Sequence, residues 1–231
     1  MGETYNVLIV DDDREICNVI AIYLKNEGFH VLKAGDGLKA LDVLRTHPVH
    51  LILLDIMMPK LDGIQTTMKI REARNIPIII ISAKSEDLDK ITGLQVGADD
   101  YVTKPFNPLE LVARVKSQLR RYVTLGKYES GDESIQLNGL ILNTAEKRLI
   151  VDGEPVRLTA IEYRIVELLM RHAGRVFSIH DIYERCWQEP SYHVDNTVAV
   201  HIRKIREKIE IDPKNPRYLK VVWGIGYKME K

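Results

Sequence analysis

The sequence has few cysteines, no net charge and no long apolar segment. Cysteine occurs only twice in 231 residues, as Cys17 and Cys186, which are too far apart to form a metal-ligand motif. We therefore expect two buried thiols in a cytosolic protein. No apolar run approaches the ~18 residues of a membrane span. The first five residues lack a basic region followed by an apolar stretch, so we expect a cytoplasmic protein that does not interact with membranes.

Net charge is zero because 33 basic residues balance 33 acidic residues. Overall charge therefore gives no indication of the partners. One local excess remains, since the segment between His201 and Lys220 has seven Lys or Arg against three acids. A small basic patch of this kind is what a phosphate-contacting surface needs. The length and the apolar fraction of 45% fit a globular protein of two domains.

Residues 1–123 alternate strand-like and helix-like segments five times. This order predicts a doubly wound (βα)5 domain of the α/β class, with right-handed crossovers. The strand segments are almost continuous apolar runs, as in parallel sheets that helices cover on both faces. The expected strands are 7–10, 29–34, 51–54, 78–81 and 100–103, and the expected helices are 16–24, 39–45, 63–72, 87–96 and 108–121.

Residues 124–134 are polar and contain glycine and serine, which predicts a linker. The domain that follows, 135–231, begins with strand signals at 140–142, 148–151 and 155–158. Three helices come next, the first opened by a capping box at 159–162, the second by 178–181, and the third running to about residue 209. A closing hairpin is expected at 218–222 and 227–229. This order predicts an α+β winged helix-turn-helix domain.

Polar side chains follow the ends of four expected strands. They are Asp11 and Asp12, Asp55, Ser82 and Lys104. The carboxyl ends of parallel strands meet at one edge of a sheet, where ligands bind, so we expect these side chains to converge. Three carboxylates in a sheltered cleft repel one another. Mg²⁺ would relieve this repulsion, because it prefers oxygen ligands and is held by few carboxylates.

Asp55 has a second expected role as a nucleophile that forms an acyl phosphate while the metal screens the incoming charge. Lys104 can pair with the phosphoryl oxygens, and Ser82 can hydrogen-bond one of them. A cis peptide at Pro105 would aim Lys104 into the pocket. The alternative is that strand-end acids only cap helices, which fits Asp13. It does not fit Asp55, because the segment after Asp55 does not begin a helix.

Four motifs resemble the receiver domain of bacterial response regulators. They are the segments 10–13, 54–63, 81–84 and 97–106. The resemblance covers the whole first domain and implies that Asp55 is the phosphoacceptor. It also implies that Mg²⁺ lies among Asp11, Asp12 and Asp55, with a further ligand from the backbone carbonyl of Met57. Ser82 stands where the family often has threonine, so the hydroxyl is kept.

The resemblance also implies a switch. Phosphorylation adds about 1.5 to 2 negative charges at one point, which Ser82 and Lys104 would sense. Movement of Ser82 towards the phosphoryl group vacates space that Tyr101 can fill, which biases an existing two-state equilibrium. The alternative is that Tyr101 only packs in the core.

Charges of both signs lie on the expected fourth helix, last strand and last helix. In response regulators with winged-helix outputs, this face forms a symmetric dimer. The resemblance implies three pairs across the two-fold axis: Lys90 with Glu110, Asp100 with Arg114, and Asp99 with Arg121. An ordinary solvated face is the alternative.

The third helix of the second domain has an apolar face that we expect to be buried. Its members are Val198, Ile202, Ile205 and Ile209. The other side can enter a DNA major groove. There we expect Val200 to touch thymine methyls, and Arg203 or Lys204 to read base edges. We expect His201 and Arg206 to meet phosphates. Asn196 and Thr197 at the start of the helix, with Trp223 in the hairpin, complete the expected DNA contacts.

The segments 196–206 and 222–228 resemble the winged-helix (OmpR/PhoB-like) response regulators. The overall pattern of the chain is also similar to that of regulators of vancomycin resistance. The resemblance implies a transcription regulator that takes its phosphoryl group from a sensor histidine kinase. It further implies a phosphorylated homodimer, binding to a direct-repeat DNA operator, and RNA polymerase as a partner. Some relatives carry arginine where this chain has Trp223, so Trp223 either packs or contacts the DNA backbone.

The sequence argues against two other functions and leaves a third open. A phosphatase of the haloacid dehalogenase type also uses an Asp nucleophile with Mg²⁺, but it needs an acid two residues further on, where this chain has Met57. A dinucleotide-binding protein has a Gly-rich turn after its first strand, where this chain has acids. A metal-dependent binding module without DNA contact stays open. We expect a protein that is not a dedicated enzyme, although it can slowly hydrolyse a phosphoryl group on Asp55.

Overall fold

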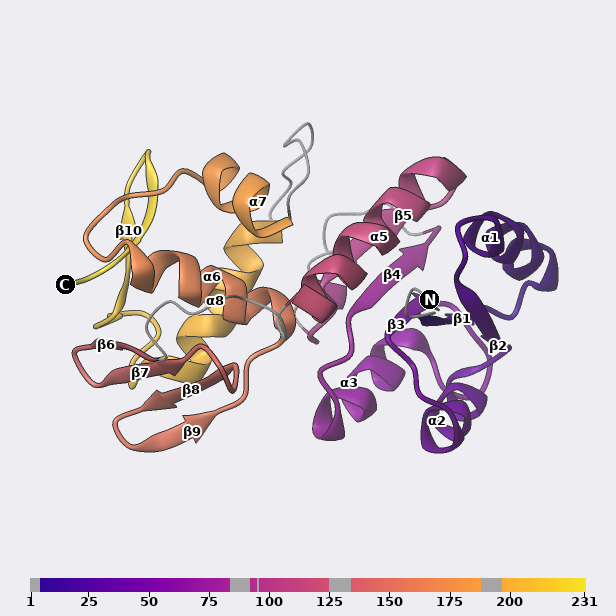
Figure 1. The fold of residues 1–231 in the computed structure, drawn as a ribbon, viewed down its shortest axis with the longest axis horizontal. Coiled ribbons are helices and arrows are strands. Elements are labelled where there is room, and N and C mark those ends of the chain that lie inside the picture. The colour runs from indigo at the N-terminus through magenta and orange to yellow at the C-terminus, as the bar shows by residue number, and fades with distance from the viewer. Residues whose placement is uncertain (1–4, 84–91, 95, 125–133, 188–196) are drawn as a thin grey trace. The chain divides into compact units, whose positions relative to one another are not determined.

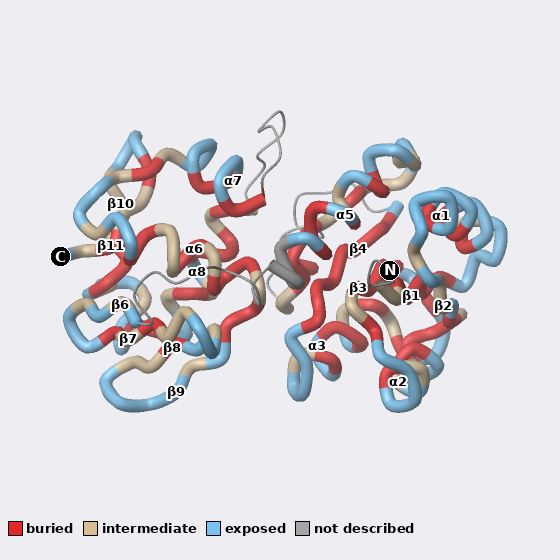
Figure 2. The backbone as a smooth tube through the Cα atoms, viewed as in Figure 1, coloured by how far each residue is buried: buried red, intermediate tan, exposed pale blue. Residues whose placement is uncertain are grey.

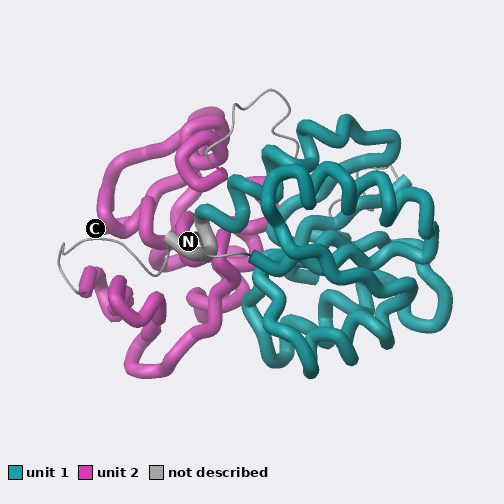
Figure 3. Tube along the Cα trace, turned by 45° about the vertical axis from the view of Figure 1, so that its right-hand side comes forward, with its two compact units in different colours: residues 1–122 teal, residues 123–231 magenta. Residues whose placement is uncertain are grey.

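The computed structural model of the chain describes residues 5–83, 92–94, 96–124, 134–187 and 197–231 (Figure 1). The chain divides into two compact units, residues 1–122 and 123–231 (Figure 3). Each unit has an apolar core of its own, which appears as buried backbone in Figure 2.

Unit 1 is built on a five-stranded parallel sheet with the order β2-β1-β3-β4-β5. The strands are β1 (Asn6–Val10), β2 (His30–Ala34), β3 (Leu51–Asp55), β4 (Ile78–Ser82) and β5 (Asp100–Thr103). Strands β3 and β4 are buried along their whole length, as their apolar sequences predict for a sheet covered on both faces. The direction in which strands are added reverses between β1 and β3, and in such sheets ligands bind at the carboxyl ends of the strands on either side of the reversal.

The helices of unit 1 lie on both faces of the sheet (Figure 1). They include α1 (Arg14–Asn26), α2 (Gly37–Thr46), α3 (Gly63–Ala73) and α5 (Pro108–Thr124). Apolar side chains of α1 and α5 share one core with β1, β3 and β4, while α2 and α3 pack together on the other face. Asp13, Asp36 and Asp62 cap α1, α2 and α3. The helix predicted at 87–96 lies mostly outside the described residues.

Unit 2 begins with a four-stranded antiparallel sheet, continues with helices and ends in a hairpin. The sheet is β6 (Ser134–Leu137), β7 (Leu140–Asn143), β8 (Arg148–Val151) and β9 (Glu154–Val156). The helices are α6 (Ala160–Arg171), α7 (Ile179–Trp187) and α8 (Thr197–Ile209), and the hairpin is β10 (Leu219–Val222) with β11 (Gly226–Met229). The predicted α/β domain and the winged-helix domain after it are confirmed.

Two local features of unit 2 bear on the sequence analysis. The capping box of α6 is present, since Thr159 and Glu162 each accept a hydrogen bond from the other's backbone N–H. Strand β6 was not predicted, and it starts at the last residue of the expected linker. Residues 125–133 of that linker lie outside the described residues.

None of the helices that the structure describes combines the length and the apolar character that crossing a membrane requires. Cys17 and Cys186 are both buried and unbridged, as the sequence predicted.

Candidate functional site

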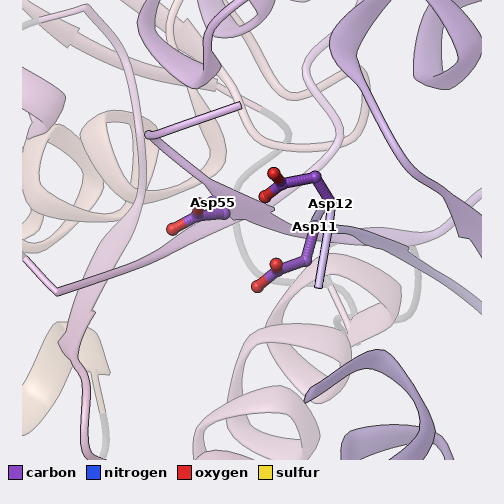
Figure 4. Close-up of side chains that lie close together, drawn as sticks. All are labelled: Asp11, Asp12 and Asp55. Atoms are coloured by element: carbon purple, nitrogen blue, oxygen red, sulfur yellow. The ribbon is translucent and has the colours of Figure 1, made fainter. Parts of the chain in front are cut away.

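Three carboxylates meet at the carboxyl edge of the unit 1 sheet. Asp11 and Asp12 follow β1, and Asp55 is the last residue of β3; one oxygen from each lies within 4.8 Å of the others. Figure 4 shows Asp11 and Asp12 extending from the end of one strand towards the side where Asp55 lies. Asp11 and Asp55 are 4% and 5% exposed, whereas Asp12 is exposed to solvent. This set of oxygen donors fits a hard divalent cation.

Local hydrogen bonds orient Asp11. Its backbone N–H donates to the carbonyl of Ala34 at 3.1 Å, and its Oδ1 accepts from the backbone N–H of Asp13 at 2.9 Å. Asp13 in turn caps α1 by accepting from the N–H groups of Glu15 and Ile16. Asp13 is therefore a helix cap, which is the alternative that the sequence offered for this residue. Because Oδ1 of Asp11 accepts from the N–H of Asp13, Oδ2 remains to accept a hydrogen bond from Lys104.

Lys104 supplies the positive charge of the pocket. Its Nζ lies 2.7 Å from Oδ2 of Asp11 and 3.4 Å from Oδ1 of Asp55. Its backbone N–H donates to the carbonyl of Ser82 at 2.8 Å, which joins the ends of β4 and β5. The Lys104–Pro105 peptide bond is cis, and Ser82 is fully buried.

Burial and the neighbouring charges shift the pKa values of Asp55 and Lys104. Burial raises the pKa of Asp55, Lys104 opposes the rise, and the charges of Asp11 and Asp12 add to it. Burial alone would lower the pKa of Lys104, but its hydrogen bond to Asp11 and the charge of Asp55 raise it above the ordinary value. The positive charge of Lys104 therefore does not fully offset the burial of Asp55 and the charges of Asp11 and Asp12, and a bound cation would add the missing positive charge.

The loop after Asp55 carries Met57, whose side chain is 60% exposed. The N–H of Gly63 donates to the carbonyl of Ile56 at 2.9 Å, and a Cβ at Gly63 would lie 2.2 Å from the carbonyl oxygen of Asp55. Only glycine permits this close return of the chain. Lys60, at a φ of 69°, places its Nζ 2.8 Å from Oδ2 of Asp36. This hydrogen bond lowers the pKa of Asp36 and joins the loop to the start of α2.

Tyr101 lies half-buried on β5. A Cβ built on Gly93 would lie 3.5 Å from its ring, so the ring packs beside the backbone of residue 93. Its switching role stays a prediction.

Four of the residues expected at a dimer face, Asp99, Asp100, Glu110 and Arg114, are paired within the described part of the chain. Arg114 lies 3.0 Å from Asp100 and 2.9 Å from Glu110. Within the single chain, Asp99 and Asp100 are buried, at 1% and 4% exposed, and their pairing across a dimer stays a prediction. Asp99 faces inward because Arg71 holds its Oδ2 at 2.7 Å. Lys90 and the side chain of Arg121 lie outside the described part of the chain.

Helix α8 presents two basic side chains to solvent. Arg203 and Lys204 are 66% and 30% exposed at the side chain, and each lies 3.0 Å from a carboxylate oxygen of Glu207. Thr197 is the first residue of α8, and Trp223 in the hairpin turn is 87% exposed. Asn196 lies outside the described residues.

Two other expected DNA contacts are wrong because their side chains are buried, and a third, Arg206, is half-buried, so its phosphate contact stays a prediction. Val200 and His201 are buried, 6% and 1% exposed, and the ring of His201 lies 5.4 Å from that of Trp187. Arg206 turns inward, donating from Nε to the carbonyl of Leu219 at 2.9 Å, and burial lowers its pKa. The reason is that α6, α7 and the hairpin all pack on α8, so more than one side of this helix is covered.

Comparisons with known proteins agree with this geometry. Residues 7–116 match the family model of the response regulator receiver domain, and residues 153–229 match that of the C-terminal transcriptional regulatory domain. The regulatory protein VanRc of Enterococcus gallinarum is 44% identical over 97% of this chain and 98% of its own length. VanR of Enterococcus faecium is 41% identical over the same shares. The chain belongs to the OmpR/PhoB-type response regulators.

Solved response regulators extend the comparison. DrrB of Thermotoga maritima, described as an OmpR/PhoB homolog, is 30% identical over 99% of this chain and all of its own, with a TM-score of 0.51. A mutant of RitR has a TM-score of 0.78 at 23% identity over 98% of this chain and 99% of its own, which supports the fold.

As a response regulator, the chain is a transcriptional regulatory protein and not a dedicated enzyme. The haloacid dehalogenase alternative gains no support from these matches. Sequence reasoning missed Arg71 and the Asp36–Lys60 pair, because ion pairs between residues far apart in the sequence have no local sequence signal.

Proposed function

We propose that this response regulator accepts a phosphoryl group on Asp55 from a sensor histidine kinase and then binds DNA as a dimer. The observation that carries the proposal is the position of Lys104 between Asp11 and Asp55, 2.7 Å from the first and 3.4 Å from the second. An ammonium group there can pair with a phosphoryl group carried by Asp55.

In the transfer step, an oxygen of Asp55 attacks the phosphorus of a phosphohistidine. The new bond joins that oxygen to phosphorus, the phosphorus–nitrogen bond breaks, and the imidazole leaves with the electron pair and takes up a proton. Asp11, Asp12 and Asp55, with the carbonyl of Met57, would hold Mg²⁺, which screens the charge of the arriving group. Burial raises the pKa of Asp55, so its negative charge depends on the nearby positive charge.

After transfer, the pocket holds about 1.5 to 2 further negative charges. Lys104 can then exchange its contact with Asp55 for the phosphoryl oxygens, and the hydroxyl of Ser82 can donate to one of them. Ser82 is fully buried, so its shift would change the packing beside Tyr101. This packing change is the proposed switch.

The proposed dimer uses the face of α5, where Glu110 is exposed and pairs with Arg114. Arg114 and Glu110 would exchange partners for Asp100 and Lys90 of a second copy. The third proposed pair across the axis is Asp99 with Arg121, and Asp99 would then exchange its contact with Arg71. Sedimentation with beryllofluoride and Mg²⁺ tests this step, with a dimer expected at micromolar concentration and a persistent monomer as the contrary result.

The proposed DNA contacts are Arg203 and Lys204 on α8, with Thr197, Asn196 and Trp223. The basic side chains of α8 suit base edges and phosphates. The proposed target is a direct-repeat operator, and RNA polymerase is a proposed partner. A gel shift with DNA from upstream of the coding region separates this function from that of a metal-dependent module without DNA contact.

The decisive experiment labels the protein with phosphorus from acetyl phosphate in the presence of Mg²⁺. Wild type should take up label, and Asp55→Asn should take up none. Asp42→Asn is the matched control, because Asp42 is an exposed carboxylate that pairs with Arg45 on α2. Label on Asp55→Asn at the wild-type level would refute the proposal.

A further inference from the structure

Glu210 follows the last residue of α8 and is only 8% exposed. Its backbone N–H still donates to the carbonyl of Arg206 at 2.9 Å, so Glu210 ends the helix. An acid at this end is unfavourable, because the carbonyl end of a helix carries partial negative charge. Burial of a carboxylate adds a further cost unless hydrogen bonds compensate it. The position of Glu210 therefore needs a reason outside the helix.

The reason lies in the two residues before the hairpin and in its first residue. One oxygen of Glu210 accepts from the backbone N–H of Arg217 at 2.6 Å. The other accepts from the N–H groups of Tyr218 and Leu219, at 2.9 and 2.8 Å. Arg206, one turn earlier, donates to the carbonyl of Leu219 at 2.9 Å. We call these four hydrogen bonds the α8–β10 clasp.

The side chains of Ile211 and Asp212, in the connection between α8 and β10, do not hold β10 against the helix. Ile211 is 96% exposed. The carboxylate of Asp212 accepts hydrogen bonds within the connection, from the backbone N–H of Lys214 and the side-chain amide of Asn215. The clasp therefore holds β10 against the end of α8. From there the hairpin runs to the turn that exposes Trp223, 87% accessible. The backbone bridge between Phe177 and Tyr227 holds the second strand of the hairpin.

We propose that Glu210 is a positioning residue for DNA binding. Its carboxylate sets the hairpin against α8, so that Trp223 meets the duplex at a fixed distance from Arg203 and Lys204. The inference rests on the proposed DNA contacts of α8 and of Trp223. Charged hydrogen bonds suit this role, since a carboxylate that accepts three N–H groups leaves the strand little freedom.

The test uses the full chain and a duplex that the wild-type chain selects from a random-sequence pool. Glu210→Gln keeps the shape of the side chain but replaces one accepting oxygen by an amide NH2 group, which cannot accept from a backbone N–H, so the clasp is weakened with little change in volume. Glu167→Gln is the matched control, because Glu167 pairs with Arg171 on the surface of α6 in the same unit. Circular dichroism shows whether each variant is folded.

Two results are expected. Backbone amides of Arg217, Tyr218 and Leu219 exchange hydrogen faster in Glu210→Gln than in wild type or Glu167→Gln. Affinity for the duplex falls about tenfold in Glu210→Gln, but by less than about twofold when Trp223→Ala is already present. Such coupling is what positioning of Trp223 requires, and a purely structural role would not produce it.

Unchanged amide exchange, or an equal loss of affinity with and without Trp223, would overturn the role of Glu210. Unfolding of Glu210→Gln would also overturn it, because the carboxylate would then act in folding. These outcomes differ from failure of the proposed function, in which the wild-type chain selects no duplex at all.

Discussion

Arg71 on α3 holds Asp99 at the start of β5, with Nη2 2.7 Å from Oδ2. The guanidinium also donates to the carbonyls of Gly97 and Ile76, at 2.8 and 2.7 Å. Asp99 accepts a further hydrogen bond, from the N–H of Ile78 at 2.9 Å. One buried pair thus joins α3, β4 and the turn before β5. It also explains why Asp99 does not face outward.

Removal of one partner of this pair should destabilise unit 1 strongly. We expect Arg71→Ala to lower the free energy of unfolding by about 3–5 kcal/mol, because it leaves a buried carboxylate without its cation. Urea unfolding followed by circular dichroism measures the change. Arg45→Ala is the control: its pair with Asp42 is exposed and should contribute at most about 1 kcal/mol. Similar losses in the two variants would contradict the prediction.

The raised pKa of Asp55 predicts how stability depends on pH in the absence of metal. Because the folded pKa lies above the unfolded value, the folded state binds more protons between the two values. Stability should therefore fall as pH rises through this window, and Asp55→Asn should melt at a higher temperature than wild type at neutral pH. Below the unfolded pKa the difference should shrink, because Asp55 is then protonated in both states.

Mg²⁺ should reverse this order by stabilising wild type more than Asp55→Asn. Thermal melting at several pH values, with Mg²⁺ and with a chelator, measures both effects. Equal melting temperatures of wild type and Asp55→Asn in chelator at all pH values would contradict the buried-charge account.

Gly63 tests the geometry of the loop after Asp55. We expect Gly63→Ala to cost about 1–3 kcal/mol of stability, because its Cβ would lie 2.2 Å from the carbonyl oxygen of Asp55. The displaced backbone should also slow labelling from acetyl phosphate. Gly35→Ala is the control, since a Cβ at Gly35 meets nothing within 4 Å. Wild-type labelling by Gly63→Ala would show that the loop tolerates the displacement.

Lys204 tests base reading by α8. We expect Lys204→Ala to reduce discrimination between the selected duplex and single-base variants by ~1–3 kcal/mol. Arg171→Ala removes one positive charge from α6, away from the proposed contact, and should leave discrimination unchanged. Fluorescence anisotropy with the set of variant duplexes measures both. An unchanged preference in Lys204→Ala would assign its side chain to phosphate contact or to its pair with Glu207.

The sequence predicted the strand ends of unit 1 well because runs such as 51–54 and 78–81 are apolar without a break. A polar residue directly after such a run marks the carboxyl edge of a parallel sheet, so the convergence of Asp11, Asp55 and Lys104 could be anticipated. Nothing in the sequence gave the direction of Lys104 relative to each acid, which depends on the packing of β4 and β5.

The errors concern residues whose exposure depends on distant parts of the chain. A single helical face was assigned to the core in α8, but neighbouring elements cover His201 and Val200 as well. The burial of Asp99 could not be anticipated because its partner Arg71 lies 28 positions earlier. Strand β6 was missed because it has only four residues and begins inside the polar segment that predicted a linker.

Both native thiols lie under the surface, and burial raises the pKa of Cys17 to about 11. Thiolate is the form that reacts with maleimides, so neither native cysteine should compete with one introduced at an exposed position. A reporter dye could then be attached by Trp223→Cys in the hairpin or by Asp42→Cys on α2 without first removing native cysteines. With a dye at each of these two positions, fluorescence could measure the distance between the hairpin and α2.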